Sequence, residues 1–363
     1  DCLTGDILTM ASMPCYDPNS FSDGIGRVEW KMLNSDDHIP MLNKALQGLY
    51  PPGSTVKPAA ALAMLHHGVD PEETVVCGGG YRLGNRVFKC LGRHGPMNMP
   101  NALMKSCNTY FYAMGHRIGY DAIAPFAKAL GLGQEFPLPF PSQRYGTIPD
   151  SAWKMRKYDQ KWSESDTLNA TIGQGYVSVS PFQLAVMAAR IASGLNIQPE
   201  IILKKRPAPG RLSFPEEHLA VVREGMNRVV NGAGTAVRSK LDIPGIAMAG
   251  KTGTAQVRRI AGSQRGQSGA WKYRDHGLFV CFAPVDNPRY GASVVIEHGM
   301  GGARAAAPIA KDVLTFLYDR EKAMASLEAL EAGWGGNIEQ RMASKYAAFQ
   351  GHPAAPPPLD PTT

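Results

Sequence analysis

The sequence PPGSTVK (residues 51–57) runs directly into the apolar stretch PAAALAMLHHG (residues 58–68). A Pro-Pro-Gly turn followed by an alanine- and leucine-rich segment predicts a helix over residues 54–67. Ser54 and Lys57 are three residues apart, so a helix places both side chains on one face. Burial in an apolar helix lowers the pKa of a lysine, which can then act as a base for a neighbouring hydroxyl. In the alternative interpretation, Ser54 only caps the helix and Lys57 extends to solvent.

The S-x-x-K spacing alone does not identify a nucleophile, because it occurs twice. SAWK (residues 151–154) has the same spacing and precedes the charged stretch MRKYDQK. Other residues must therefore decide between Ser54 and Ser151.

Two further clusters occur once each in the chain. In SCNTYFY (residues 106–112), Ser106 and Asn108 are two residues apart, a spacing that lets both face one cleft at a helix junction. Such a pair can pass a proton and hold an amide. AGKTGTAQV (residues 249–257) is a probable strand containing Lys251, Thr252, Gly253 and Thr254.

The glycine and the threonines of this strand suit a ligand that binds along its edge. Gly253 permits close approach of a ligand backbone. The hydroxyls of Thr252 and Thr254 and the charge of Lys251 then suit a carboxylate. The order S-x-x-K, S-x-N, K-T-G is typical of penicillin-binding proteins and serine β-lactamases. The set favours Ser54 as the nucleophile and Ser151 as a chance match.

Longer stretches carry a closer resemblance. They are GDILTMASMPCYDPNSF (5–21), LYPPGSTVKP (49–58), SCNTYFY, ATIGQGYVSVSPFQLA (170–185), GKTGTAQV and IEHGMGGARAAAPIAKDVL (296–314). The chain resembles the class B penicillin-binding transpeptidases, above all the elongation type, the penicillin-binding protein 2 family, over roughly residues 1–320. The resemblance implies a peptidoglycan D,D-transpeptidase that forms an acyl-enzyme, acts in cell elongation and rod shape, and is a target of β-lactam antibiotics.

The resemblance also implies roles for the clustered residues. Ser54 attacks the bond between the two D-Ala residues of a stem peptide, and Lys57 accepts its proton. Ser106 passes a proton to the leaving group beside Lys251, and Asn108 holds the donor amide. Thr252 and Thr254 bind the terminal carboxylate. The N–H groups of Ser54 and Thr254 are expected to form the oxyanion hole.

The resemblance implies a place in the cell and partners as well. Such proteins are anchored in the cytoplasmic membrane, face the periplasm, and work with a SEDS-family glycosyltransferase and rod-complex proteins. No stretch of 18 apolar residues occurs in this chain, so we expect the anchoring N-terminal helix to lie outside it. The net charge of +7 agrees with an acidic or polymeric partner or an anionic membrane surface, although a solvated basic surface explains it equally well. No aromatic-basic pattern indicates nucleic acid.

A glycine-rich segment between the first two clusters suggests a metal site. Cys77, Cys90, His94 and Cys107 have the spacing C-x12-C-x3-H-x12-C. Three thiolates and one imidazole suit a tetrahedral structural zinc ion, which would brace a loop without a core of its own. The alternatives are a Cys77–Cys90 disulfide or buried free thiols. No cofactor is expected in the acyl-transfer chemistry.

The pattern along the chain predicts an α+β fold, with an antiparallel sheet flanked by helices and a helical lobe inserted into it. Helices are expected at residues 100–130, 180–194 and 215–232, and strands within 245–257, 277–284 and 290–299. Residues 1–320 are expected to form the transpeptidase domain, with sheet parts in about 1–50, including a strand pair at the start, and 200–320. The helical lobe takes about 51–199. Residues 321–363 add a C-terminal helix and a Pro-rich tail.

Three other functions agree with parts of the sequence. A class A β-lactamase would carry an E-x-x-x-N pair in the helical lobe, and none occurs in this chain. A class D β-lactamase would carry S-x-V in place of Ser106-Cys107-Asn108. A β-lactam sensor would keep the acylating residues, and a division-type transpeptidase would share all three motifs.

Overall fold

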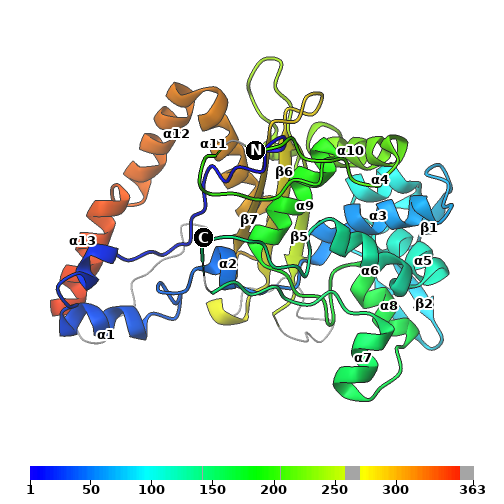
Figure 1. Cartoon of the computed structure of the whole chain (residues 1–363), viewed down its shortest axis with the longest axis horizontal. Helices are drawn as coiled ribbons and strands as arrows, with labels where there is room; N and C mark the ends of the chain where they lie inside the picture. The colour runs from blue at the N-terminus through cyan, green and yellow to red at the C-terminus, as the bar shows by residue number, and fades with distance from the viewer. Residues whose placement is uncertain (141, 205, 258–269, 352–363) are drawn as a thin grey trace. The chain divides into compact units, whose positions relative to one another are not determined.

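The computed structural model describes residues 1–140, 142–204, 206–257 and 270–351 (Figure 1). The Pro-rich tail predicted at residues 352–363 lies outside this described part. The strands are β1 (Val75–Cys77), β2 (Gly80–Leu83), β3 (Arg86–Lys89), β4 (Gly95–Met97), β5 (Ala249–Ala255), β6 (His276–Ala283) and β7 (Tyr290–Ile296). The α-helices are α1 (Arg27–Ser35), α2 (Lys44–Gln47), α3 (Lys57–His66), α4 (Met99–Met104), α5 (Asn108–Ile118), α6 (Tyr120–Ala129), α7 (Ser151–Tyr158), α8 (Glu164–Thr171), α9 (Pro181–Ser193), α10 (Glu216–Asn231), α11 (Ala307–Tyr318), α12 (Arg320–Gly333) and α13 (Ile338–Gly351). Short helical turns are η1 (Pro18–Phe21), η2 (Gly53–Val56), η3 (Val237–Ser239), η4 (Trp271–Tyr273) and the π-helical turn η5 (Gly302–Ala306).

The largest sheet is antiparallel, with strand order β5-β6-β7. All eight residues of β6 except His276 are buried, because this central strand is covered on both faces. Helix α9 packs against β6 and β7, and α10 packs against β5. Figure 1 shows these helices beside the sheet, with α3 to α6 grouped into a helical lobe. The predicted α+β fold, with an antiparallel sheet flanked by helices, is confirmed. The three strands of this sheet all lie within residues 249–296, so in the described part of the chain residues 1–50 do not supply the strand predicted there.

Local signals explain why several helices begin where they do. Ser180 caps α9 in a capping box with Gln183, and Pro181 occupies the first turn. The same helix is capped at its C-terminal end by Gly194, whose φ of 70° lies in the left-handed region that favours glycine. Gly119 separates α5 from α6 with a φ of 80°, so the helical segment expected at residues 100–130 is divided here.

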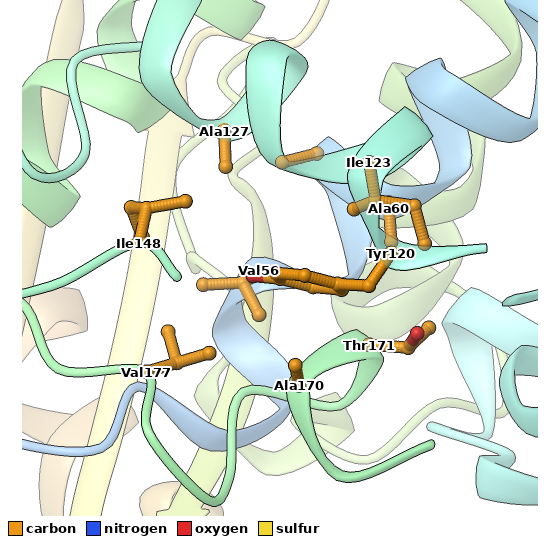
Figure 2. Close-up of a pocket in the computed structure, with 10 residues that line it drawn as sticks. Val56, Ala60, Tyr120, Ile123, Ala127, Ile148, Ala170, Thr171 and Val177 are labelled. Carbon is orange, nitrogen blue, oxygen red and sulfur yellow. The ribbon is translucent and has the colours of Figure 1, made fainter. Parts of the chain in front are cut away.

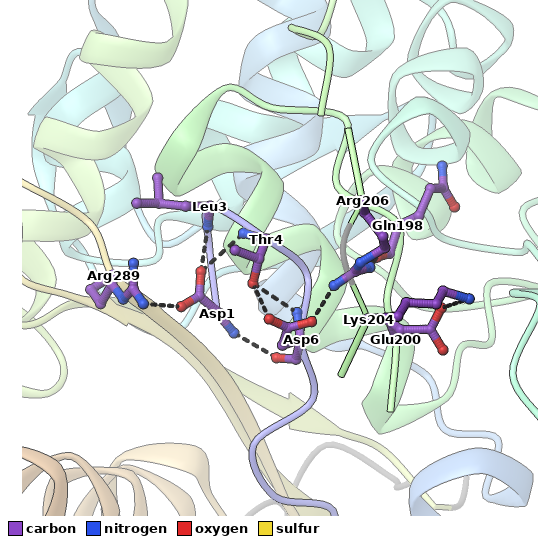
Figure 3. A network of polar contacts seen from close by, with 9 residues as sticks. All are labelled: Asp1, Leu3, Thr4, Asp6, Gln198, Glu200, Lys204, Arg206 and Arg289. Carbon is purple, nitrogen blue, oxygen red and sulfur yellow. Dashed lines mark hydrogen bonds and ion pairs between the residues drawn. The ribbon is translucent and has the colours of Figure 1, made fainter. Parts of the chain in front are cut away.

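The start of the chain differs from the expected strand pair. The Asp1 carboxylate accepts the backbone N–H groups of Leu3 and Thr4 at 2.8 and 3.0 Å, which closes a turn instead of extending a strand. Asp6 then pairs with Arg206 and forms only an isolated bridge to Glu200. Figure 3 shows this network, which ties Asp6 to Arg206 and Asp1 to Arg289.

The chain divides into two compact units. The first comprises residues 1–10 and 45–311 and contains the three-stranded sheet and the helical lobe. The second comprises residues 11–44 and the described residues from 312 onward, where Lys345 forms an ion pair with Asp36 at 2.5 Å and α1 packs against α13. In the described part of the chain, no helix combines the length and the apolar character needed to cross a membrane. All the candidate site residues lie in the first unit.

Candidate active site

The first S-x-x-K lies at the start of the helical lobe. Ser54 belongs to the 3-10 turn η2, and Lys57 is the first residue of α3, so the predicted helix begins as a tighter turn. Ser54 is half-buried, and its hydroxyl makes no hydrogen bond with any described residue. The nine residues Lys57–Leu65 are all buried, which confirms the apolar surroundings predicted for the lysine.

Lys57 is held as a buried amine. Its side chain is 0% exposed, and its Nζ lies 2.8 Å from Ser106 O and 2.7 Å from Asn108 Oδ1. Burial lowers the pKa of Lys57 to about 7, although the thiols of Cys90 and Cys107 act in the opposite direction. A neutral amine has two N–H groups and one lone pair. The two carbonyl oxygens take both N–H groups, so the lone pair remains to accept a proton from a hydroxyl.

Ser106 occupies a strained position between α4 and α5. Its φ is 54°, in the left-handed region that residues with side chains seldom adopt. This conformation brings Ser106 Oγ to 3.0 Å from Lys251 Nζ and 3.3 Å from Lys57 Nζ. One hydroxyl therefore links the lysines of two motifs. Strain of this kind is common at functional sites, where surrounding contacts hold it in place.

Lys251 is the second buried lysine. Its side chain is 0% exposed, and its Nζ also donates to its neighbour's carbonyl, Thr252 O, at 3.0 Å. Burial lowers the pKa of Lys251 well below its ordinary value, and the positive charge of Lys57 lowers it further. The fold thus brings Lys57, Ser106 and Lys251, one residue from each of the three motifs, into contact.

Glycines allow strand β5 to lie against the Ser54 turn. A Cβ on Gly253 would lie 2.7 Å from Thr55 Cγ2 and 2.9 Å from Pro52 O. A Cβ on Gly53 would lie 2.4 Å from Thr254 O. Contacts this short do not occur with real side chains, so both glycines are required by close approach.

The backbone of Thr254 faces the Ser54 turn. Its carbonyl accepts a hydrogen bond from Gln174 Nε2 at 3.2 Å and lies beside Gly53, so it points away from β6. In a strand, the N–H and C=O of one residue point to the same side. The Thr254 N–H therefore points toward the Ser54 turn, as an oxyanion donor must. Sequence reasoning assigned no role to Gln174.

The two threonines of K-T-G differ in exposure. Thr254 is exposed, whereas Thr252 is 8% exposed and its Oγ1 lies 2.7 Å from Thr235 Oγ1. Asn108 begins α5, and its Nδ2 donates to Lys89 O at 3.3 Å. Its Oδ1 is already engaged by Lys57.

The second S-x-x-K has different surroundings. Ser151 Oγ donates to Asp121 Oδ2 at 2.5 Å. Lys154 Nζ lies 2.6 Å from Asp166 Oδ2, and this hydrogen bond raises the pKa of Lys154. A lysine held in its charged form is a poor base, so this pair is suited to a structural role.

The predicted metal ligands lie close together. The ligand atoms of Cys77, Cys90, His94 and Cys107 all lie within 4.8 Å of one another, and all six cysteines are free thiols. His94 Nδ1 is 3.5 Å from Cys77 Sγ and 3.6 Å from Cys90 Sγ, and Cys90 Sγ is 3.9 Å from Cys107 Sγ. A tetrahedral zinc ion with Zn–S of about 2.3 Å and Zn–N of about 2.0 Å has edges of about 3.8 Å between sulfurs and about 3.5 Å from sulfur to nitrogen. The spacing of the donors therefore fits zinc.

Short hairpins and the start of α5 support this cluster. Strand β1 pairs with β4, and β2 pairs with β3. The hydrogen bond between the Cys90 and Cys107 side chains, with backbone N–H groups such as that of Asn108, places the pKa of Cys90 well below its usual range. Cys107 lies between Ser106 and Asn108 in the chain, so the cluster adjoins two residues that contact Lys57.

Behind the Ser54 turn, the core contains a small apolar cavity. Figure 2 shows the Tyr120 ring near Val56, with Ile148, Ala170 and Val177 around them. Among the residues that the structure describes, no charged side chain lines the cavity. It belongs to the apolar support of η2 and α3 rather than to the cluster of polar groups that faces Ser54.

Comparison with known proteins agrees with this geometry. The family model of the penicillin binding protein transpeptidase domain matches residues 1–315. The chain is 37% identical over 344 residues to the peptidoglycan D,D-transpeptidase MrdA of Acinetobacter baumannii, covering 89% of this chain and 50% of that protein. It is 31% identical over 339 residues to the peptidoglycan D,D-transpeptidase PbpA of Mycobacterium tuberculosis, covering 86% of this chain and 64% of that protein.

Solved structures give the same result. The crystal structure of Pseudomonas aeruginosa PBP2 in complex with WCK 5153 has a TM-score of 0.76 and 35% identity, covering 86% of this chain and 68% of that one. The PBP2 of Helicobacter pylori, in a complex with MreC, has a TM-score of 0.80 and 30% identity, covering 88% and 59%. The chain spans about half the length of MrdA and related proteins. Its three motifs, its fold and these matches show that the chain belongs to the penicillin-binding protein transpeptidase family.

Proposed function

We propose that this chain is the catalytic domain of an elongation-type peptidoglycan D,D-transpeptidase that forms an acyl-enzyme on Ser54. One observation carries the proposal. The buried Lys57 amine has both N–H groups engaged by carbonyl oxygens and lies one turn from an unbonded Ser54 hydroxyl. That arrangement provides a nucleophile and a base that is neutral near pH 7.

In the acylation step, Lys57 accepts the Ser54 proton as Oγ attacks the carbonyl carbon between the two D-Ala residues of a stem peptide. The negative charge that develops on the carbonyl oxygen is stabilised by the N–H groups of Ser54 and Thr254. The donor amide is held by Asn108, and the terminal carboxylate is held by Thr252 and Thr254.

Collapse of this tetrahedral intermediate breaks the peptide bond. Ser106 Oγ lies within hydrogen-bond reach of both buried lysines and passes its proton to the leaving D-Ala amine. Lys57 then gives Ser106 Oγ the proton that it took from Ser54. Lys251 stabilises the transient negative charge on Ser106 Oγ. An amine from a second stem peptide attacks the acyl-enzyme by the same route in reverse. A β-lactam acylates Ser54 in the same way, but no separate leaving group departs, because the amine that is released stays attached to the acyl group.

The test is intact-mass spectrometry of the purified chain over time after mixing with penicillin. A lasting adduct of one equivalent is expected in the wild type and in Ser151→Ala, and none in Ser54→Ala. Labelling that survives in Ser54→Ala contradicts the assignment. An adduct that decays within seconds while the drug is consumed indicates a serine β-lactamase instead. A lasting adduct without turnover of stem peptides indicates a β-lactam sensor.

We further propose that the Cys77, Cys90, His94 and Cys107 cluster binds a structural zinc ion. The free thiols and the tetrahedral spacing of their donor atoms support this proposal. The ion would link the hairpins of β1–β4 to the start of α5, and the acyl-transfer chemistry would not pass through it. Metal analysis of chelator-free protein is expected to give one zinc per chain in the wild type and in Cys281→Ser, a buried control, and much less in Cys90→Ser. Well under one equivalent in the wild type contradicts the site.

We also propose that the whole protein acts at the periplasmic face of the cytoplasmic membrane, anchored by an N-terminal helix. The Helicobacter pylori relative forms a complex with MreC, and this supports a partner of the rod complex for the present protein. A SEDS-family glycosyltransferase is the other partner that family membership favours. Copurification of the full-length protein with these partners, compared with a division-type transpeptidase, tests the elongation assignment.

A further inference from the structure

The loop at residues 232–236, after α10, carries a threonine that belongs to none of the three motifs. Thr235 Oγ1 lies 2.7 Å from Thr252 Oγ1, the first threonine of K-T-G. Thr235 is half-buried, whereas Thr252 is 8% exposed. The two hydroxyls form one hydrogen bond at the strand edge that faces α10.

Two hydrogen bonds and one glycine fix the conformation of this loop. Ala236 N donates to Val229 O at 3.0 Å, and Lys105 Nζ donates to Ala233 O at 2.6 Å. A Cβ on Gly234 would lie 2.3 Å from Val229 O, so the turn requires glycine here. Because Lys105 directly precedes Ser106, the loop is tied to the S-x-N motif as well as to β5. Thr235 is therefore held at a defined position beside Thr252.

The number of hydroxyl hydrogens limits what this pair can do. Each threonine has one O–H hydrogen. If Thr252 donated to Thr235, only its lone pairs would remain, and they would repel a carboxylate. If Thr235 donates to Thr252, the Thr252 hydrogen stays available, and the accepted hydrogen bond strengthens Thr252 as a donor.

We propose that Thr235 is a positioning residue of the carboxylate subsite, whose hydroxyl donates to Thr252 Oγ1 and thereby directs the Thr252 O–H toward the ligand's carboxylate. This inference rests on the proposed function, in which Thr252 binds the terminal carboxylate of a stem peptide or of a β-lactam. Thr235 acts only through Thr252 and has no part in the attack by Ser54.

The test compares Thr235→Val, which keeps the shape but removes the hydroxyl, with Thr235→Ser, which keeps the hydroxyl. The second-order rate constant of acylation is measured with benzylpenicillin and with its methyl ester, which lacks the carboxylate. In Thr235→Val, the rate constant for the acid is expected to fall about tenfold or more, through weaker initial binding, while that for the ester changes little. Thr235→Ser is expected to stay close to the wild type with both compounds.

The ratio of the acylation rate constants for the acid and the ester separates a positioning role of Thr235 from a structural one. An equal loss with both compounds in Thr235→Val would mean that the loop only supports the fold, and it would overturn the inference. Rates equal to those of the wild type would overturn it as well. If wild-type Ser54 is not acylated at all, the proposed function fails first and the inference fails with it.

Discussion

Replacing Lys57 with Met should abolish acylation and change how the stability of the protein depends on pH. Met has a similar length and no charge, so it suits the buried site beside Phe111, over whose ring the Lys57 Nζ lies at 5.2 Å. The variant loses the base, and we expect acylation by penicillin to fall by a factor of about 10² to 10⁴. The effect on stability is the sharper test, since it follows from the pKa.

The magnitude follows from proton linkage. The pKa of Lys57 falls from 10.5 in the unfolded chain to about 7 in the fold. Between these values the unfolded state binds more protons, so the contribution of Lys57 to stability rises with pH. Keeping this amine neutral and buried costs about 4 kcal/mol at pH 7 and about 2 kcal/mol at pH 9. Relative to Lys57→Met, the wild type should therefore gain about 2 kcal/mol over this range.

A second effect of the substitution does not depend on pH. Ser106 O and Asn108 Oδ1 each lose a hydrogen-bond donor in the variant. Each loss lowers the free energy of unfolding by about 1–3 kcal/mol. At pH 7 the two effects nearly cancel, and at pH 9 the variant becomes the less stable protein.

The assay is urea unfolding of both proteins at pH 7, 8 and 9, with the slopes compared to establish that the unfolded states are alike. Lys154→Met is the matched control. Its ion pair with Asp166 raises the pKa of Lys154, so the lysine stays charged in both states until the pH exceeds 10.5. The difference in free energy of unfolding between Lys154→Met and the wild type should stay constant from pH 7 to 9. A flat difference for Lys57→Met as well would refute the argument that burial depresses this pKa.

Three further predictions follow from the same geometry. The acylation rate constant of the wild type should rise about tenfold from pH 6 to pH 8, because a base with a pKa of about 7 becomes neutral over that range; a rate independent of pH would show that another group controls the step. Gly53→Ala should slow acylation about a hundredfold, since φ is 52° and the added Cβ would lie 2.4 Å from Thr254 O, whereas Gly210→Ala, with open space around it, should react normally. Removal of metal by a chelator should lower the melting temperature and slow acylation, with recovery on adding zinc, because Cys107 lies between Ser106 and Asn108; unchanged melting would argue against a structural ion.

Periodicity and capping residues were sufficient to predict much of the fold. Strands β5, β6 and β7 were predicted because each is a short apolar run bounded by turns. Helix α9 was predicted from Ser180, Pro181 and Gly194, and these residues do form its caps. Such signals are local, so they predict an element without knowledge of the residues that it packs against.

The elements that were missed depend on tertiary contacts or on weaker signals. No helix was predicted within residues 132–175, yet α7 and α8 lie there. Their polar composition hid them, although Ser163 and Asp166 form a capping box at the start of α8. The Lys154–Asp166 pair then joins the two helices. The expected strand pair at the start of the chain is a turn, because the Asp1 carboxylate takes N–H groups that a strand would have needed.

For the site, the sequence by itself determined which chemical groups are available and in which order they occur. It could not determine which S-x-x-K has a usable base, because Ser54–Lys57 and Ser151–Lys154 have the same spacing. Only the tertiary structure decided this, by burying Lys57 among carbonyl oxygens and pairing Lys154 with a carboxylate. The pKa of a lysine depends on solvent exposure and nearby charge, and both are set by residues distant in the chain. For the same reason, only the structure places Thr235 beside Thr252.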